Sequence, residues 1–437
     1  MIGTKAAWAV LAAGLLLLVP RDSGAAAKPS FEDLVANLKS PNAKTREAAA
    51  VALGKSGRRD VVASLAALVR DPEPRVRLEV ARALSQLKDP TAIPALVTAL
   101  GDGDPQIREE AIGGMVGIYA DRERVGPVDR FLRVFSDELD RPTGGLYGRV
   151  DPAVIQGLAR SLRDENKATR EEAALALGIL DGKGAIADLQ TALADPDADV
   201  RGAAATALGK IGTAKDGRAL IPLLADDSYP VKLRALHALG TLRVQEAAPP
   251  LREMYEANRR REIGLKVLET LSRIGDSGQA ELFQQLIQDP DPEKKRLGIE
   301  GLARISDPSR MAAFKKDYQR EGNQELKLAY AFAITRMGDH AFLDSLVLSL
   351  PARTVGSRSR GYILELGSDV LPELFPYLND PDAEIRAQLC DIIAILGDPE
   401  AASRLTPLLN DPSGNVSDRA NRAIEHLRRL KGARAGQ

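Results

Sequence analysis

The sequence contains few of the residues on which disulfide bonds and metal sites depend. Its 437 residues include one cysteine and three histidines, and aromatic residues make up 4% of the chain. A lone cysteine excludes an intramolecular disulfide, and Cys390 lies in the apolar run IRAQLCDIIAIL, where a buried thiol is common. The histidines share no metal-ligand spacing, so we expect no metal site. They are His237, His340 and His426.

The sequence also lacks the short motifs that carry catalytic chemistry. It contains no HExxH, CxxC, Walker or GxSxG motif. The glycine-rich stretch GGLYG has no strand before it and no helix after it, which a phosphate-binding loop requires. We therefore expect no catalytic residue and no bound cofactor, and a protein that is not an enzyme.

An excess of charge of one sign is missing as well. Lys and Arg number 60 against 61 Asp and Glu, which gives a formal net charge of −1. Without a strong overall field, neither nucleic acid nor an anionic membrane is favoured as a partner. The expected partners are other proteins.

One long apolar run is present, near the N-terminus. AAWAVLAAGLLLLVP (residues 6–20) follows Lys5 and precedes the small residues SGAAA. This pattern predicts a signal peptide at residues 1–27, with an uncleaved anchor as the alternative. The run is shorter than the roughly 20 residues that span a bilayer, and no cysteine follows it for lipid attachment. We expect a bacterial protein that is exported, periplasmic or secreted, with no stable membrane span after cleavage.

A recurring phrase fills most of the remaining chain. DPDADVRGAAATALGKIG at residues 195–212 returns in related forms about every 31 residues, as in DPEPRVRLEVARALSQLKD from Asp71. A period of this size is typical of architectures that stack one small unit. One position of the phrase is basic, with steps of 31 or 32 residues, or twice that, from Arg46 to Lys327. These residues are Arg46, Arg77, Arg108, Arg170, Arg201, Lys232, Lys295 and Lys327, with Arg386 further on.

Each unit has the pattern of two short helices. In residues 184–212 one apolar face fits a first helix and another fits a second helix. The faces are Ile186, Leu189 and Leu193, then Val200, Ala204, Leu208 and Ile211. Asp195 or Asp197 can cap the second helix, and Gly209 and Gly212 are expected at its left-handed closing turn. Helices of about 10 to 14 residues are marginal alone, so each unit must pack against its neighbours.

An acidic residue lies six positions before the basic residue in most units. The pairs include Asp71 and Arg77, Asp164 and Arg170, Asp195 and Arg201, Asp289 and Lys295, and Asp380 and Arg386. Filling the gaps in this register gives about thirteen units from residue 28 to the C-terminus. Because Arg108 and Arg170 are twice 31 residues apart, the register places one unit between them, at residues 121–150, as a degenerate repeat or a loop insertion.

The phrase DPxxxVR…A..ALG.IGD and the two-helix unit resemble HEAT repeats, and most closely the HEAT-like repeats of phycobilisome lyases. The resemblance implies an all-α, right-handed α-solenoid with first helices outside and second helices on the concave face. It also implies that the Asp and Arg positions form a ladder of ion pairs between neighbouring units. If exposed, such pairs contribute about 0–1 kcal/mol each, so the ladder is expected to set register more than stability.

Two segments depart from the repeat and are the candidate partner-binding sites. Residues 121–150 contain RPTGGLYGRV, a loop sequence, and the candidates there are Arg130, Phe131, Arg133, Phe135, Tyr147 and Arg149. The second segment, residues 311–377, loses the Asp-Pro phrase, and its candidates are Arg353, Arg358, Arg360 and Tyr362. Arginine and aromatic residues are enriched at protein interfaces. The alternative is that the aromatic rings of both segments fill the core.

These patterns predict an exported scaffold that binds other proteins without catalysis. HEAT-like repeats at residues 28–120 and 151–437 would flank the irregular segment. The alternative is an enzyme or maturation factor of the bilin-lyase kind, which the same repeat phrase permits. Export would conflict with that alternative, because the lyases that the repeats resemble act in the cytoplasm.

Overall fold

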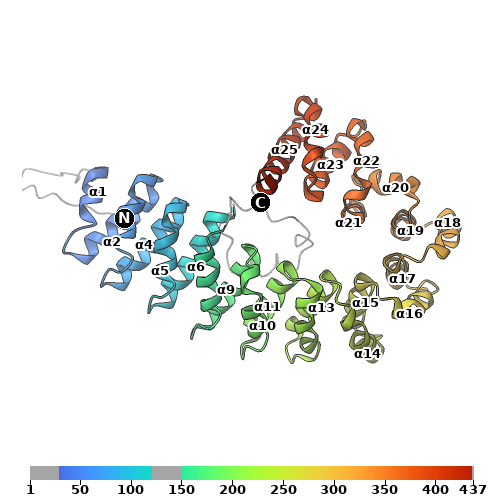
Figure 1. Ribbon diagram of the computed structural model, residues 1–437, viewed down its shortest axis with the longest axis horizontal. Coiled ribbons are helices and arrows are strands. Elements are labelled where there is room, and N and C mark those ends of the chain that lie inside the picture. Colours follow the sequence, from blue (N-terminus) through green and yellow to red (C-terminus); the bar gives the residue numbers. More distant parts are fainter. Residues whose placement is uncertain (1–28, 121–149, 436–437) are drawn as a thin grey trace, which may run out of the picture.

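A computed structural model describes residues 29–120 and 150–435 of the chain. In those two ranges every regular element is an α-helix or a 3-10 helix. The helices form pairs that stack along a curved row from α1 to α25 (Figure 1). The predicted all-α solenoid is confirmed.

The first helix of each pair is short. In the C-terminal half of the row, α14, α16, α18, α20, α22 and α24 lie on the outer side of the curve (Figure 1). Several first helices are joined to 3-10 turns, and α12 continues as the 3-10 helix Arg218–Ala225, in which Pro222 offers no N–H. The first helices are α1 (Phe31–Asn37), α3 (Val62–Ala66), α5 (Ile93–Ala99), α8 (Pro152–Ser161), α10 (Ile186–Ala192), α12 (Ala214–Gly217), α14 (Ala248–Asn258), α16 (Ala280–Leu286), α18 (Met311–Arg320), α20 (Leu343–Val347), α22 (Leu371–Leu374) and α24 (Ala402–Leu405).

The second helices are longer and form the inner row of the curve (Figure 1). Consecutive second helices pack against one another along the row. They are α2 (Ala43–Lys55), α4 (Pro74–Leu87), α6 (Pro105–Tyr119), α9 (Lys167–Ile179), α11 (Ala198–Ile211), α13 (Tyr229–Thr241), α15 (Glu262–Ile274), α17 (Pro292–Ile305), α19 (Gln324–Arg336), α21 (Gly356–Leu366), α23 (Ala383–Leu396) and α25 (Gly414–Ala435).

The unit at residues 184–212 shows how the repeated phrase folds. Asp197 is the N-cap of α11 and its side chain accepts a hydrogen bond from the Asp199 N–H. The apolar stripe predicted for this helix is buried, with Val200, Ala204 and Leu208 at 0% exposure. A short helix with one apolar stripe is stable only when covered, and the neighbouring pairs supply the cover.

The glycine of the repeated ALG triplet has a different role from the one predicted. Gly209 lies inside α11, and Gly212 has extended backbone (φ −81°, ψ 176°), so neither forms a left-handed closing turn. A Cβ on Gly209 would lie 2.7 Å from the Cβ and 3.0 Å from the Cα of Ala238 on α13. Gly178 faces Ala207 in the same way, with 3.0 Å to its Cα. These glycines allow successive second helices to approach closely.

The stack is continuous across the irregular segment. Helix α6 packs directly on α9, and Arg108 Nη2 lies 2.6 Å from Asp164 Oδ1. The register allowed a degenerate repeat or a loop insertion at residues 121–150, and the direct contact of α6 and α9 leaves no place in the stack for a further unit between them. The sequence spacing did not reveal this, because the segment has nearly the length of one unit.

Two further sequence expectations bear on the described residues. Cys390 is fully buried in α23, where burial raises the pKa of its thiol to about 12. Among the helices of residues 29–120 and 150–435, none combines the length and apolarity needed to cross a bilayer.

Candidate functional site

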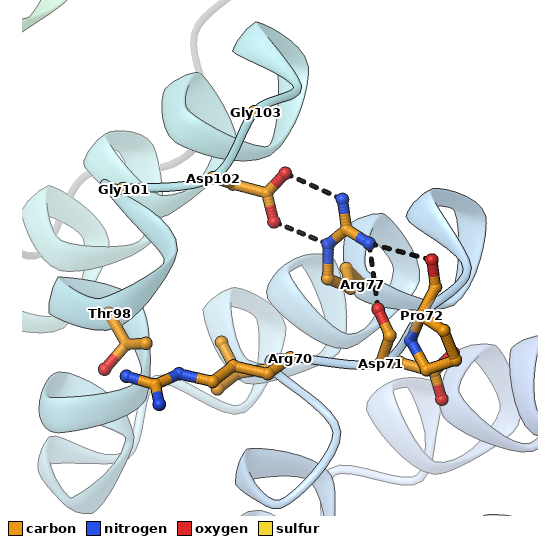
Figure 2. A pocket seen from close by; sticks show the side chains of 9 residues that line it. Arg70, Asp71, Pro72, Arg77, Thr98, Gly101, Asp102 and Gly103 are labelled. Atoms are coloured by element: carbon orange, nitrogen blue, oxygen red, sulfur yellow. Dashed lines mark hydrogen bonds and ion pairs between the residues drawn. The ribbon is translucent and has the colours of Figure 1, made fainter.

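A ladder of arginines joins the turns of neighbouring units. Arg77 Nε and Nη2 donate to the Asp102 carboxylate of the next unit at 2.6 and 2.9 Å (Figure 2). Its Nη1 donates to the carbonyl oxygens of Asp71 and Pro72 in its own unit, at 2.8 and 3.3 Å. Arg77 therefore joins two turns, and it pairs with the aspartate 25 residues after it.

The same bidentate pairing recurs along the solenoid. The Arg201 guanidinium lowers the pKa of Asp226, and the Arg386 guanidinium lowers the pKa of Asp411. In each case the aspartate also accepts the backbone N–H two residues on, which completes the turn. The further pairs of this kind are Arg46 with Asp71, Arg170 with Asp195, Arg201 with Asp226, and Arg386 with Asp411.

The ladder is interrupted at two of the predicted positions. Asp289 and Asp380 follow units that have Gly264 and Val355 where an arginine would be needed, 25 residues earlier. Asp289 instead lies 4.0 Å from Lys294 Nζ. The basic residue of that unit, Lys295, pairs with Glu321 at 3.1 Å. Both interruptions border the most tightly curved part of the row (Figure 1).

The rungs are less exposed than the sequence suggested. In the rung between α11 and α13, the Arg201 side chain is 16% exposed and that of Asp226 is 6% exposed. The estimate of about 0–1 kcal/mol holds for exposed pairs and is too low for this one. Loss of one partner would leave the other largely shielded from water.

We expect Arg201→Ala to lower the free energy of unfolding by about 1–3 kcal/mol, because Asp226 loses its guanidinium partner and two turn carbonyls lose their side-chain donor. Urea denaturation monitored by circular dichroism measures the change. Arg163→Ala is the matched control, since Arg163 is exposed and forms a single 2.8 Å pair with Asp188. An equal loss in both variants would contradict a special role for the ladder.

The inner face of the solenoid changes charge along its length. One position, eight residues after the aspartate of the turn, is acidic in α4, α6 and α9 and basic in α13, with alanine in α11. The residues there are Glu79, Glu110, Glu172, Ala203 and Arg234. On α6, the pKa of the neighbouring Glu109 is raised by burial and then by Glu172 of α9. A Cβ on Gly202 of α11 would meet the Arg234 guanidinium, so this side chain lies across α11.

Further along, two inner helices meet across a third. Tyr362 of α21 donates its hydroxyl to Glu300 of α17 at 2.5 Å, although α19 lies between them in the row. Arg304 of α17 forms a bidentate pair with Glu365 of α21, at 2.8 Å on each oxygen. We call Glu300, Arg304, Tyr362 and Glu365 the clasp. Because the clasp covers α19, the inner side of that helix is buried too, which explains its apolar sequence LAYAFAI.

Glu300 is the central anion of the clasp. Burial alone would raise the pKa of its carboxyl group, but Arg296 and Arg304 outweigh burial and lower it to about 2. Arg296 Nη1 lies 2.5 Å and Arg304 Nη1 3.2 Å from the carboxylate. Glu300 is therefore ionised at neutral pH, deep between two guanidinium groups.

Glu365 is surrounded by three arginines. Besides Arg304, it contacts Arg243 Nη2 at 2.8 Å and Arg336 Nη1 at 3.9 Å. Burial raises the pKa of its carboxyl group, and the arginines, Arg304 first, lower it overall. Arg243 follows α13, so this contact joins units that are not neighbours in the stack.

The predicted site residues of the second irregular segment do not share one surface. Tyr362 is 4% exposed and its ring stacks on Phe332 at 4.5 Å, so its prediction as a surface residue was wrong and the core alternative holds. Arg358 points into the same region, 3.9 Å from Glu300 and 3.8 Å from Glu325. Arg360 is partly buried, whereas Arg353 is exposed before α21 begins. The segment is a structural junction with charged residues at its edge.

The predicted site residues of the first irregular segment lie outside the described residues. They are Arg130, Phe131, Arg133, Phe135, Tyr147 and Arg149.

Sequence reasoning missed the residues around Glu365. A signal was present, because an arginine recurs at or just after the ends of α13, α15, α17 and α19, as Arg243, Arg273, Arg304 and Arg336. Nothing in the repeat indicated that one glutamate of α21 would meet three of them. The described residues hold no cluster of His, Cys, Asp or Glu suited to a metal ion. The hollows found in them are shallow, and the one in Figure 2 lies beside the rung of Arg77 and Asp102.

The comparisons with known proteins agree with this architecture. The family model for HEAT repeats matches residues 31–115, 152–232, 217–282 and 352–428, more than half of the chain. A solved structure of Kap95p with RanGDP has 14% identity and a TM-score of 0.50, and the match covers 93% of this chain and 57% of that chain. The search of curated proteins found no match.

Two other solved structures are similar at lower TM-scores. The complex of CpcE and CpcF of phycocyanin lyase from Nostoc sp. PCC7120 has 22% identity and a TM-score of 0.30, covering 66% of this chain and 98% of that chain. An engineered protein has 20% identity and a TM-score of 0.37, covering 91% of this chain and 98% of that chain. With its stacked helix pairs and the family match over most of its length, the chain belongs to the HEAT-repeat family.

Proposed function

We propose that this protein is an exported scaffold that binds another protein along its inner face and performs no bond chemistry. The observation that carries the proposal is the charge change along that face, from Glu79, Glu110 and Glu172 to Arg234 and the three arginines that meet at Glu365. The glutamates recur at one position of three successive second helices, α4, α6 and α9, so the acidic end of the face is built into the repeat. A long surface with ordered charge favours an extended partner of complementary charge.

HEAT repeats commonly mediate protein interactions, and the family membership of the chain supports this proposal. Export is inferred from the apolar run at residues 6–20 and the small residues after it. Recovery of the protein from the periplasmic or secreted fraction, with a new N-terminus near Lys28, would support export. Recovery from the cytoplasm with Met1 retained would contradict it.

Site-specific photo-crosslinking in the producing cells tests the binding face. Thr206 of α11 lies on an inner helix and Thr191 of α10 on an outer one, and each hydroxyl donates to the carbonyl four residues earlier. We expect a photoreactive residue at position 206 to form a discrete adduct with a partner protein, because a partner on the inner face would lie close to it. The same residue at position 191 is the matched control. Adducts at 191 as strong as those at 206, or none at 206, would contradict the proposal.

A further inference from the structure

Arginines gather at the C-terminal ends of four successive second helices. Arg243, Arg273, Arg304 and Arg336 lie at or just after the C-terminal ends of α13, α15, α17 and α19. Helix C-termini carry partial negative charge and favour a nearby cation. This effect explains one arginine at each end, but it does not require three of them to meet at one carboxylate.

The cluster around Glu365 has more cations than anions. Arg243, Arg304 and Arg336 all lie within 4.0 Å of this one carboxylate. Arg273, in contrast, pairs with Glu269 on its own helix at 3.2 Å. Of the three arginines, Arg304 is further neutralised by Glu300, whereas Arg243 and Arg336 have Glu365 as their ion-pair partner among the described residues.

Arg336 is the least satisfied member of the cluster. Its guanidinium donates no hydrogen bond to another described residue, its Nε is buried without a partner, and its one ion pair is long. Burial lowers its pKa, the attraction of Glu365 opposes this shift, and repulsion from Arg243 and Arg304 adds to it. A guanidinium has five N–H donors, so Arg336 retains binding capacity beside the accessible Arg243, whose side chain is 44% exposed.

We propose that Arg243 and Arg336 bind a carboxylate of an acidic segment of a partner protein on the inner face. This inference rests on the proposed function and names the chemistry of the partner. Arginine pairs with carboxylates in a planar, two-point geometry, which Arg304 and Glu365 already show in this cluster. The acidic inner face of α4, α6 and α9 repels an acidic segment. The segment is therefore directed to the part of the inner face that α13 to α21 form.

A fluorescein-labelled polyglutamate peptide serves as the probe in an anisotropy titration of the purified chain at low salt. A polyglutamine peptide of the same length is the neutral control. We expect polyglutamate to bind, polyglutamine not to bind, and added salt to weaken the binding. Because the chain has a net charge of −1, general attraction does not account for such binding. Failure of polyglutamate to bind the wild-type chain would overturn the inference.

Variants locate the binding. Arg336→Gln and Arg243→Gln are each expected to weaken polyglutamate binding by about tenfold or more, and Arg336→Lys, which keeps the charge, by less. Arg82→Gln is the matched control, because Arg82 of α4 is similarly exposed and lies at the acidic end. Unchanged affinity of both cluster variants, with unchanged melting curves, would overturn the inference. So would displacement of the peptide by inorganic phosphate but not by acetate at matched ionic strength, because the cluster would then prefer phosphate.

The proposed scaffold function and the proposed binding of an acidic segment can fail independently of each other. If an adduct forms at position 206 but polyglutamate does not bind, the scaffold stands and its partner is not acidic at this site. If polyglutamate binds but no adduct forms in cells, the arginine cluster binds carboxylates and the proposed scaffold function fails.

Discussion

Replacing Glu300 with glutamine is expected to lower the free energy of unfolding by about 3–5 kcal/mol. The substitution keeps the shape of the side chain but removes the negative charge that lies between Arg296 and Arg304, 2.5 and 3.2 Å from their guanidinium nitrogens. Arg296 would then be buried beside a neutral amide, whereas Arg304 would keep its pair with Glu365. Tyr362 would keep an acceptor, although a weaker one, so the link from α17 to α21 would persist in part. Urea or guanidinium denaturation at neutral pH measures the loss.

Glu293→Gln provides the control on the same helix. Glu293 lies 3.6 Å from Arg296 but is 54% exposed, so its removal is expected to change stability by no more than about 0.5 kcal/mol. A loss in Glu300→Gln no larger than that in Glu293→Gln would show that the clasp contributes little to stability. The curvature would then depend on apolar packing alone.

Gly209→Val is expected to destabilise the protein by about 3 kcal/mol. The added Cβ would lie 3.0 Å from the Cα of Ala238, a backbone atom that can move only if α11 and α13 separate. Separation would loosen the close contact on which the stacking of these two units depends. Thermal and chemical denaturation both measure the effect.

Gly113→Ala is the control for this substitution. Gly113 lies inside α6, is exposed, and a Cβ there would have no neighbour within 4 Å. Since alanine has the higher helix propensity, this change is expected to stabilise the chain by about 0.5–1 kcal/mol. If Gly209→Ala stabilised the chain to the same degree, the close approach of α11 and α13 would not be the reason for a glycine at that position.

The repeat itself was predictable because its causes are local. The apolar stripe of Val200, Ala204 and Leu208, and a cap from one of two aspartates, follow from spacing within one unit. The role of Gly209 was mistaken because glycine near a predicted helix end suggests a left-handed turn. Whether a glycine closes a helix or admits a neighbouring one depends on the next unit. Gly275 and Gly397 do close their helices, with φ of +66° and +70°.

The candidate site was predictable to a much smaller extent. Sequence reasoning singled out Tyr362 and the arginines near it, but not Glu300 or Glu365, because both look like ordinary exposed positions of a helical repeat. Glu365 and Arg243 are 122 residues apart, and no periodicity connects them. The interrupted rungs at Gly264 and Val355 were visible in the sequence, and they border the tightly curved region where these residues meet.

The sequence by itself determined the helical pairs, their period and the need to stack, because a short helix with one apolar stripe must be covered by the next. Tertiary structure alone decided which units meet across the curve, and that α6 would rest directly on α9. Small differences in the packing of each pair add up along the row. Only their sum brings Arg243, Arg304 and Arg336 to one glutamate.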